Sequence, residues 1–130
     1  MCCTGNQGGN RHGSVIAHGQ TNPTKSLPWI QHPKSAEVSL RYLVTGKDTR
    51  GRLSFHHVRI EAGCAIGDHT DAGRVETHDV IAGSGTRTLE SSVIPYTPGV
   101  VGIMPADQVH RPGAGDGGLF LPAMFSPPLV

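Results

Sequence analysis

The sequence is short of aromatic residues, of charge and of long apolar runs, and each shortage excludes a class of protein. Aromatic residues make up 5% of the chain, and 11 basic residues balance 10 acidic ones, so the net charge is +1. Without a basic run, nucleic acid and anionic membranes are not expected as partners. No apolar stretch approaches the roughly 20 residues of a membrane-spanning helix.

Cysteine is also scarce. The three cysteines are Cys2, Cys3 and Cys64, and an odd number with two adjacent residues near the N-terminus is not a disulfide framework. Residues 1–13 have no apolar segment of the kind found in secretory signals. We therefore predict a cytoplasmic protein with reduced thiols.

Glycine and proline, in contrast, are abundant, with 18 and 10 residues. They divide the chain into short runs, and no stretch of 12 or more residues keeps the 3.6-residue apolar period of a helix. The strand-like runs are residues 38–44, 52–60, 75–82, 86–94, 100–105 and 118–130. Short strands separated by turn-forming segments predict an all-β protein, an antiparallel sandwich or barrel.

The chain before the first predicted strand has a different character. Residues 1–35 are predicted to form a flexible, extended N-terminal arm, because X-Pro pairs recur within them, and residues 36–130 are predicted to form the barrel. Trp29 and Ile30 would anchor the arm on the barrel. Since an extended segment has little to pair with in a single chain, we predict a homodimer that exchanges these arms.

Ionisable side chains gather just after the middle of the chain. Residues two apart on a strand share a face, which places His69 beside Asp71 and Glu76 beside His78, with a possible turn between the two pairs. His110 would arrive from a later strand. We predict that His69, Glu76 and His110 bind a divalent transition metal. Asp71 would be a fourth ligand or a catalytic base, and His78 would support a ligand or act as acid and base.

Two imidazoles and a carboxylate are the ligand set of non-haem Fe(II), and Mn, Ni or Zn would also accept it. The run 52–60 offers a substrate contact. Its alternation puts His57 and Arg59 on one side and His56 and Val58 on the other. If the first side lines the barrel, His57 and Arg59 would bind a substrate carboxylate; otherwise they are charges on the outer face.

The spacing of these residues resembles the two motifs of the cupin superfamily. The first runs as Gly63, five residues, His69-Thr70-Asp71, four residues, Glu76, six residues and Gly83. The second runs as Gly99, five residues, Pro105-Ala106-Asp107, two residues and His110. Cupins are double-stranded β-helix or jelly-roll barrels, so the resemblance implies this fold with metal ligands at His69, Glu76 and His110. Asp71 stands where a second histidine is usual, and Asp107 and Ala114 replace a glycine and an asparagine.

A weaker resemblance concerns ectoine synthases, cupins that close a ring by eliminating water. It covers about half of the chain, in the segments SFHHVRIEAG, HDVIAGSG, PGVVGIMPADQVH and AMFSPPL. By this resemblance Glu76 and His110 fall on metal positions and Phe125 on an aromatic residue of the cavity. The metal-binding tyrosine of that family aligns with Gly102, and its cavity cysteine aligns with Ala123.

The leading functional prediction is a metal-dependent enzyme that acts on a small polar metabolite bearing a carboxylate. Lyase, cyclase or isomerase chemistry is favoured by the segments similar to ectoine synthases. A non-haem Fe(II) dioxygenase remains open because of the predicted two-histidine, one-carboxylate set. A non-catalytic cupin that binds a small ligand is a further alternative, since fold alone does not establish catalysis.

Overall fold

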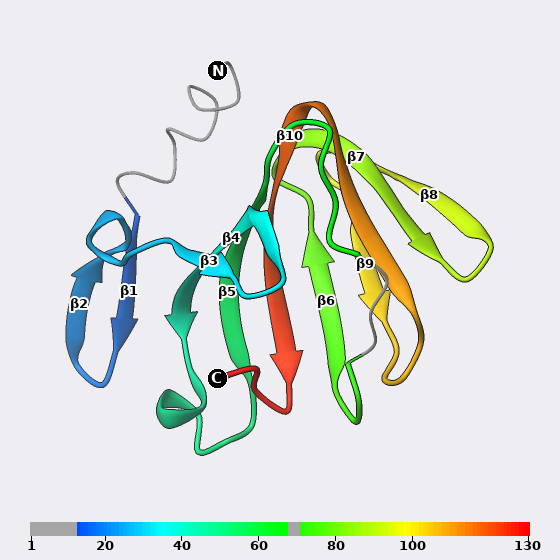
Figure 1. Ribbon diagram of the computed structural model, residues 1–130. Coiled ribbons are helices and arrows are strands. Elements are labelled where there is room, and N and C mark those ends of the chain that lie inside the picture. The colour runs from blue at the N-terminus through cyan, green and yellow to red at the C-terminus, as the bar shows by residue number, and fades with distance from the viewer. Residues whose placement is uncertain (1–12, 68–70) are drawn as a thin grey trace.

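The computed structural model describes residues 13–67 and 71–130, and it confirms the all-β prediction (Figure 1). The strands are β1 (Ser14–Ala17), β2 (Gln20–Pro23), β3 (Ile30–His32), β4 (Ser35–Val44), β5 (Ser54–Ile60), β6 (Val75–Asp79), β7 (Ala82–Leu89), β8 (Ser92–Tyr96), β9 (Val101–Met104) and β10 (His110–Ser126). Two short 3-10 turns are η2 (Thr24–Ser26) and η3 (Gly46–Asp48). Within the described ranges, no helix has the length and apolar character needed to cross a bilayer.

The main sheet is an antiparallel jelly roll. Its strands follow the order β3-β4-β5-β10-β6-β9, and β7 pairs with both β10 and β8. The long strand β10 holds the roll together because it changes partners along its length. Residues 110–114 and 119–120 pair with β7, residues 119–125 pair with β5, and residues 123–126 pair with β6.

Glycine lets β7 and β10 stay paired on both sides of an irregularity. The register between β7 and β10 shifts between Ala114 and Leu119. At Gly83 and Gly85 of β7, an added Cβ atom would overlap the carbonyl oxygens of Gly118 and Gly113. Only glycine lets the two backbones approach this closely, so the glycine-rich segment that reads as a turn in the sequence is instead part of a curved strand.

The core lies between the two layers of the roll. Leu40 pairs with Val58, and Val58 pairs with Leu121, so these residues of β4, β5 and β10 face the interior together. All three are buried, and each contributes roughly 1.5–3 kcal/mol by leaving water. Because successive residues of a strand face opposite sides, this register turns His57 and Arg59 to the outer face.

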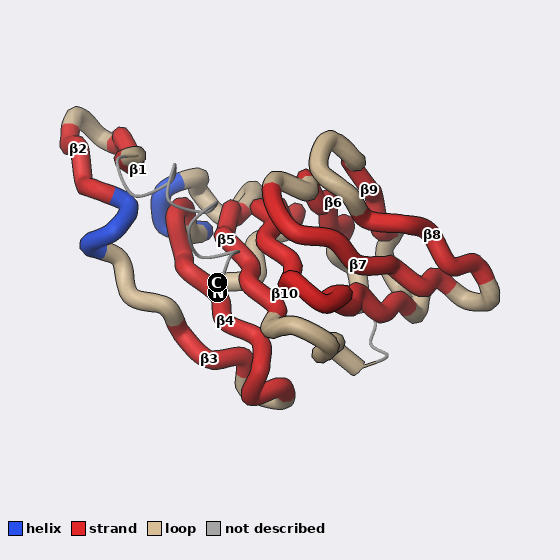
Figure 2. The backbone as a smooth tube through the Cα atoms, turned by 90° about the horizontal axis from the view of Figure 1, so that it is seen from above, coloured by secondary structure: helices blue, strands red, loops and turns tan. Residues whose placement is uncertain are grey.

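The arm forms a separate hairpin before it joins the sheet. Among the described strands, β1 and β2 pair only with each other, around a turn in which His18 and Gly19 have positive φ angles of 52° and 77°. Two such residues give the type of turn that suits a tight hairpin. The hairpin lies to one side of the roll (Figures 1 and 2).

The later part of the arm is anchored as predicted. Ile30 of β3 pairs with Leu40 of β4, and the Trp29 ring receives two guanidinium groups. The Cζ atoms of Arg41 and Arg59 lie 4.4 and 4.1 Å from its centroid. Exchange of arms in a homodimer stays a prediction.

Candidate metal centre

Two loops, one from each motif, are tied together at the open end of the roll. In the first, the Arg74 amide donates to the Asp71 carbonyl at 3.0 Å, and Gly73 has a φ of 67°, which closes the turn predicted before β6. In the second, Asp107 accepts a hydrogen bond from the Gly73 amide at 3.0 Å and itself has a φ of 68°. Asp107 therefore keeps the left-handed backbone for which glycine is usual, a conformation that aspartate tolerates.

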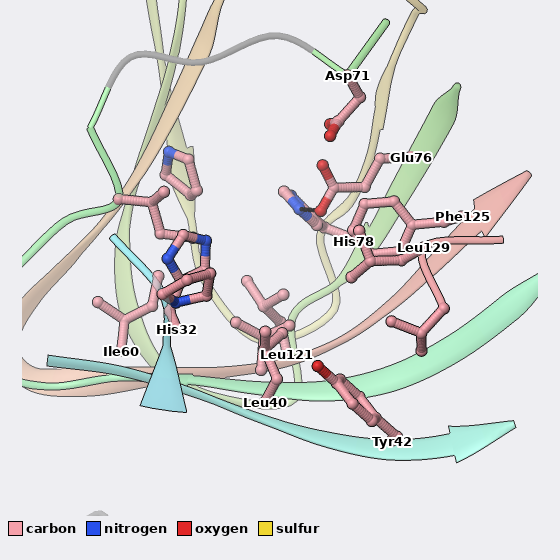
Figure 3. A pocket seen from close by; sticks show the side chains of 15 residues that line it. His32, Leu40, Tyr42, Ile60, Asp71, Glu76, His78, Leu121, Phe125 and Leu129 are labelled. Carbon is pink, nitrogen blue, oxygen red and sulfur yellow. Dashed lines mark hydrogen bonds and ion pairs between the residues drawn. The ribbon is translucent and has the colours of Figure 1, made fainter. Parts of the chain in front are cut away.

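Three predicted metal ligands converge beside these loops. One ligand atom from each of Asp71, Glu76 and His110 lies within 4.8 Å of the others. His110 Nε2 is 3.2 Å from Glu76 Oε1 and 3.5 Å from Asp71 Oδ2. Glu76 and His110 are buried, and Asp71 is partly exposed beside them. Figure 3 shows the Asp71 and Glu76 carboxylates close together on one side of the cavity. His69 lies outside the described residues.

The charges in this cluster depend on one another. Burial alone would raise the pKa of Glu76, but hydrogen bonds from His110 and His78 outweigh it and hold that pKa well below its ordinary value. Burial alone would lower the pKa of His110. The hydrogen bond from His110 to Glu76 outweighs burial, so the pKa of His110 is raised. The carboxylate thus stays ionised in a buried position because positive charge is available to it.

The orientation of His110 fits a metal ligand. Its Nδ1 is 3.1 Å from the Gln108 carbonyl oxygen and donates to it, which leaves Nε2 directed at the two carboxylates. Metal-binding histidines commonly donate their second nitrogen to such an acceptor, which fixes the tautomer. Two carboxylates and one imidazole form a donor set that Fe(II), Mn, Ni or Zn accepts. The described residues can therefore hold a divalent cation.

His78 lies behind Glu76 rather than at the cluster. Its Nε2 is 2.7 Å from Glu76 Oε2, and its Nδ1 is 2.9 Å from the Tyr96 hydroxyl. Tyr96 is fully buried, and burial raises its pKa to about 12. The hydroxyl therefore stays protonated and donates a hydrogen bond to His78 Nδ1. Both nitrogens of His78 are thus occupied, an arrangement that suits its predicted supporting role.

The sequence analysis missed Tyr96. The predicted strand 86–94 ends before it, whereas β8 continues to Tyr96 and turns its ring inward. Gly102 supplies the space, because a Cβ atom there would overlap the Tyr96 hydroxyl. A tyrosine hydroxyl therefore lies beside the position that aligns with the ectoine synthase tyrosine, although it comes from another strand. The available signal was a tyrosine preceded by Pro95 and two aliphatic residues.

A cavity of about 260 Å³ opens beside the cluster. Asp71, Glu76 and His78 line one side of it, and Phe125 borders it as predicted (Figure 3). His57 and Arg59 do not line it, so of the two positions that the sequence left open for them, the structure has the outer face. The register of β5 with its neighbours turns both to the outer face, where His57 packs on Phe120 and Arg59 on Trp29.

Comparison with known proteins supports the architecture. No protein-family model matches the chain, and no curated protein matches its sequence. Many solved structures match its fold. A predicted oxalate decarboxylase from Thermotoga maritima has a TM-score of 0.73 at 16% identity, covering 79% of this chain and 95% of that chain. An RmlC-like cupin from Shewanella frigidimarina has a TM-score of 0.66 at 14% identity, covering 79% and 86%.

An ectoine synthase from P. lautus is also similar. It has a TM-score of 0.66 at 25% identity, covering 76% of this chain and 69% of that chain. The structural likeness therefore includes the family that the sequence segments resemble.

Proposed function

Since the chain belongs to the cupin superfamily by its fold, we propose that it is a metal-dependent enzyme. Its substrate would be a small metabolite bearing a carboxylate, and its chemistry that of a lyase, cyclase or isomerase. The observation that carries this proposal is the convergence of Asp71, Glu76 and His110 beside a cavity that Asp71 and Glu76 line. Among similar structures, an ectoine synthase and a predicted oxalate decarboxylase favour this class of chemistry.

Each residue has a part in this proposal. Asp71, Glu76 and His110 would hold the metal, with His69 as a further predicted ligand. When bound, a divalent metal supplies Lewis acidity that polarises a substrate oxygen. His78 and Tyr96 keep one oxygen of Glu76 engaged, so the other oxygen remains directed at His110. Asp71 borders the cavity and is partly exposed, which suits it to accept a proton from a bound substrate.

Two other functions make different predictions. A dioxygenase would consume oxygen with its substrate, and His69 would complete its two-histidine ligand set. A non-catalytic binding cupin would bind ligand without turnover, and it is favoured by the carboxylate at Asp71 in place of the usual histidine. Turnover of a carboxylate substrate without oxygen would support the lyase, cyclase or isomerase, and oxygen uptake would support the dioxygenase.

Metal content tests the proposal directly. Protein purified without chelators and soaked with Fe(II), Mn, Ni or Zn is expected to hold about one metal ion per chain by elemental analysis. His110→Ala should lower the metal affinity by more than about 100-fold, because a ligand is lost from the cluster. His57→Gln is the matched control, since His57 is also a buried histidine but lies on the outer face. Wild-type protein that gains no metal on soaking would contradict the proposal.

A further inference from the structure

We propose that the substrate has an apolar body and a single charged head group, which binds at the metal. This inference rests on the proposed function and narrows it. Apart from the cluster, the cavity wall is largely hydrocarbon. Its buried members include Leu40, Val58, Ile60, Leu121 and Phe125. Figure 3 shows Leu40, Leu121 and Ile60 across the cavity from the carboxylates.

The described part of the cavity wall also has no fixed positive charge for a second acidic group. Among the described residues that line it, none is lysine or arginine. Arg41 and Arg59 belong to the same two strands as Leu40 and Val58, but they face outward and pack on Trp29. A second carboxylate on the substrate would thus enter a wall of side chains without an arginine to pair with. Burying an unpaired charge in such surroundings is strongly unfavourable.

The polar groups away from the cluster fit a neutral substrate body. Tyr42 and His32 line the cavity, and the Tyr42 hydroxyl points into it in Figure 3. The Tyr42 hydroxyl can form a hydrogen bond with a neutral oxygen or nitrogen, whereas His32 Nδ1 already accepts one from the Lys34 amide. At the cluster, the two carboxylates balance the charge of one divalent cation, so the head group would be the sole unbalanced charge.

A matched pair of compounds tests the inference on Zn-loaded protein. Hexanohydroxamate and adipate monohydroxamate share the same metal-binding head and chain length, and they differ in a terminal methyl or carboxylate. By calorimetry at pH 8, the methyl compound is expected to bind at least ten-fold more tightly. It should also bind more tightly than acetohydroxamate, by up to about four-fold for each buried methylene. Equal affinities of the matched pair would overturn the inference.

A variant of His32, whose imidazole lines the cavity, tests whether this side chain provides a positive charge. If His32 provided the positive charge for a second acidic group, wild type would show no preference for the methyl compound. The preference is therefore expected in wild type and in His32→Gln alike. Its presence in the variant alone would overturn the inference for the natural cavity.

A second pair needs no metal and separates this inference from the proposed function. 1-Hexanol and 6-hydroxyhexanoate again differ in a terminal methyl or carboxylate, and their binding to metal-free protein can be followed by NMR titration. Preference for hexanol would support an apolar cavity even if the protein held no metal. Preference for the acid would overturn the inference.

Variants show whether these probes occupy the cavity. Leu129→Phe reduces its volume at a partly buried position near the end of the chain, and it is expected to weaken hexanol binding at least five-fold. Val101→Phe is the control, because Val101 is 70% exposed and lies outside the cavity. Equal binding by wild type and both variants would place the probe elsewhere and overturn the assignment.

Discussion

At the scale of single residues, the hydrogen-bonded series Tyr96–His78–Glu76 explains how a buried carboxylate keeps one orientation. Tyr96 donates to His78, and His78 in turn donates to Glu76, so the second oxygen of Glu76 remains directed at His110. Because partners behind a ligand fix its orientation, their loss weakens metal binding without removing a ligand.

Tyr96→Phe should therefore lower the affinity for Zn²⁺ by about 10–100-fold, while the fold is kept. Removing a hydroxyl from a buried hydrogen bond should also cost roughly 1–2 kcal/mol of unfolding free energy. Competition with a chromophoric chelator measures the affinity, and urea unfolding of metal-free protein measures the stability. Tyr42→Phe is the matched control, because no hydrogen bond joins its hydroxyl to His78 or Glu76 in the described structure. Wild-type affinity in Tyr96→Phe would show that His78 is held without the tyrosine.

Residue spacing predicted the cluster but could not choose between the faces of a strand. Asp71, Glu76 and His110 were found because the motif spacing fixes their separations along the chain; in the structure Glu76 and His110 lie on β6 and β10, and Asp71 lies in the loop before β6. His57 and Arg59 were assigned to a face by alternation, which defines two sides but not which one faces inward. That choice depends on the pairing of Leu40 and Leu121 with Val58, contacts between distant parts of the chain.

At the scale of elements, prediction failed where glycine and turns hide strand boundaries. The sequence indicates a strand only from residue 118, because the glycines at 113, 115, 117 and 118 are typical of a turn. In the structure, β10 begins at His110 and includes these glycines. The predicted run 86–94 crosses the boundary between β7 and β8, where Glu90 takes a φ of 53°. A non-glycine residue with such a backbone gives little local signal, and only the pairing of the two strands defines the turn.

The contacts of Trp29 attach the N-terminal arm to the sheet. Trp29 lies against Arg41 and Arg59, and its ring also meets Phe120 at 6.4 Å between centroids. Trp29→Ala should lower the unfolding free energy by about 2–3 kcal/mol, through lost apolar burial and two lost cation–π contacts. It should also speed proteolytic cleavage within residues 13–35, because the arm loses an anchor. Trp29→Phe should show an intermediate effect in both urea unfolding and timed trypsin digestion. Equal digestion rates for wild type and Trp29→Ala would show that β3 pairing alone secures the arm.

At the scale of the whole molecule, the adjacent histidines of β5 link stability to pH. His56 and His57 face opposite sides of the sheet, and both are buried. Burial lowers the pKa of each from 6.5 to about 4; the charge of Arg41 adds to the effect at His57, and that of Glu76 partly opposes it at His56. Between pH 6.5 and pH 4, His56 and His57 are therefore protonated in the unfolded chain but neutral in the folded chain. The contribution of these two histidines to the unfolding free energy is complete above pH 6.5 and is lost as the pH falls from 6.5 toward 4.

Between pH 7 and pH 5, each of these histidines should cost roughly 2 kcal/mol of unfolding free energy. Urea unfolding of metal-free protein at both pH values gives the total loss, to which other groups also contribute. His57→Leu isolates one histidine, because leucine keeps an apolar contact with Phe120 and cannot be protonated. Its loss between the two pH values should be smaller than that of wild type by roughly 2 kcal/mol, whatever its stability at pH 7. An unchanged loss in the variant would mean that His57 accepts a proton in the folded protein, and that the face beneath Trp29 is open to water.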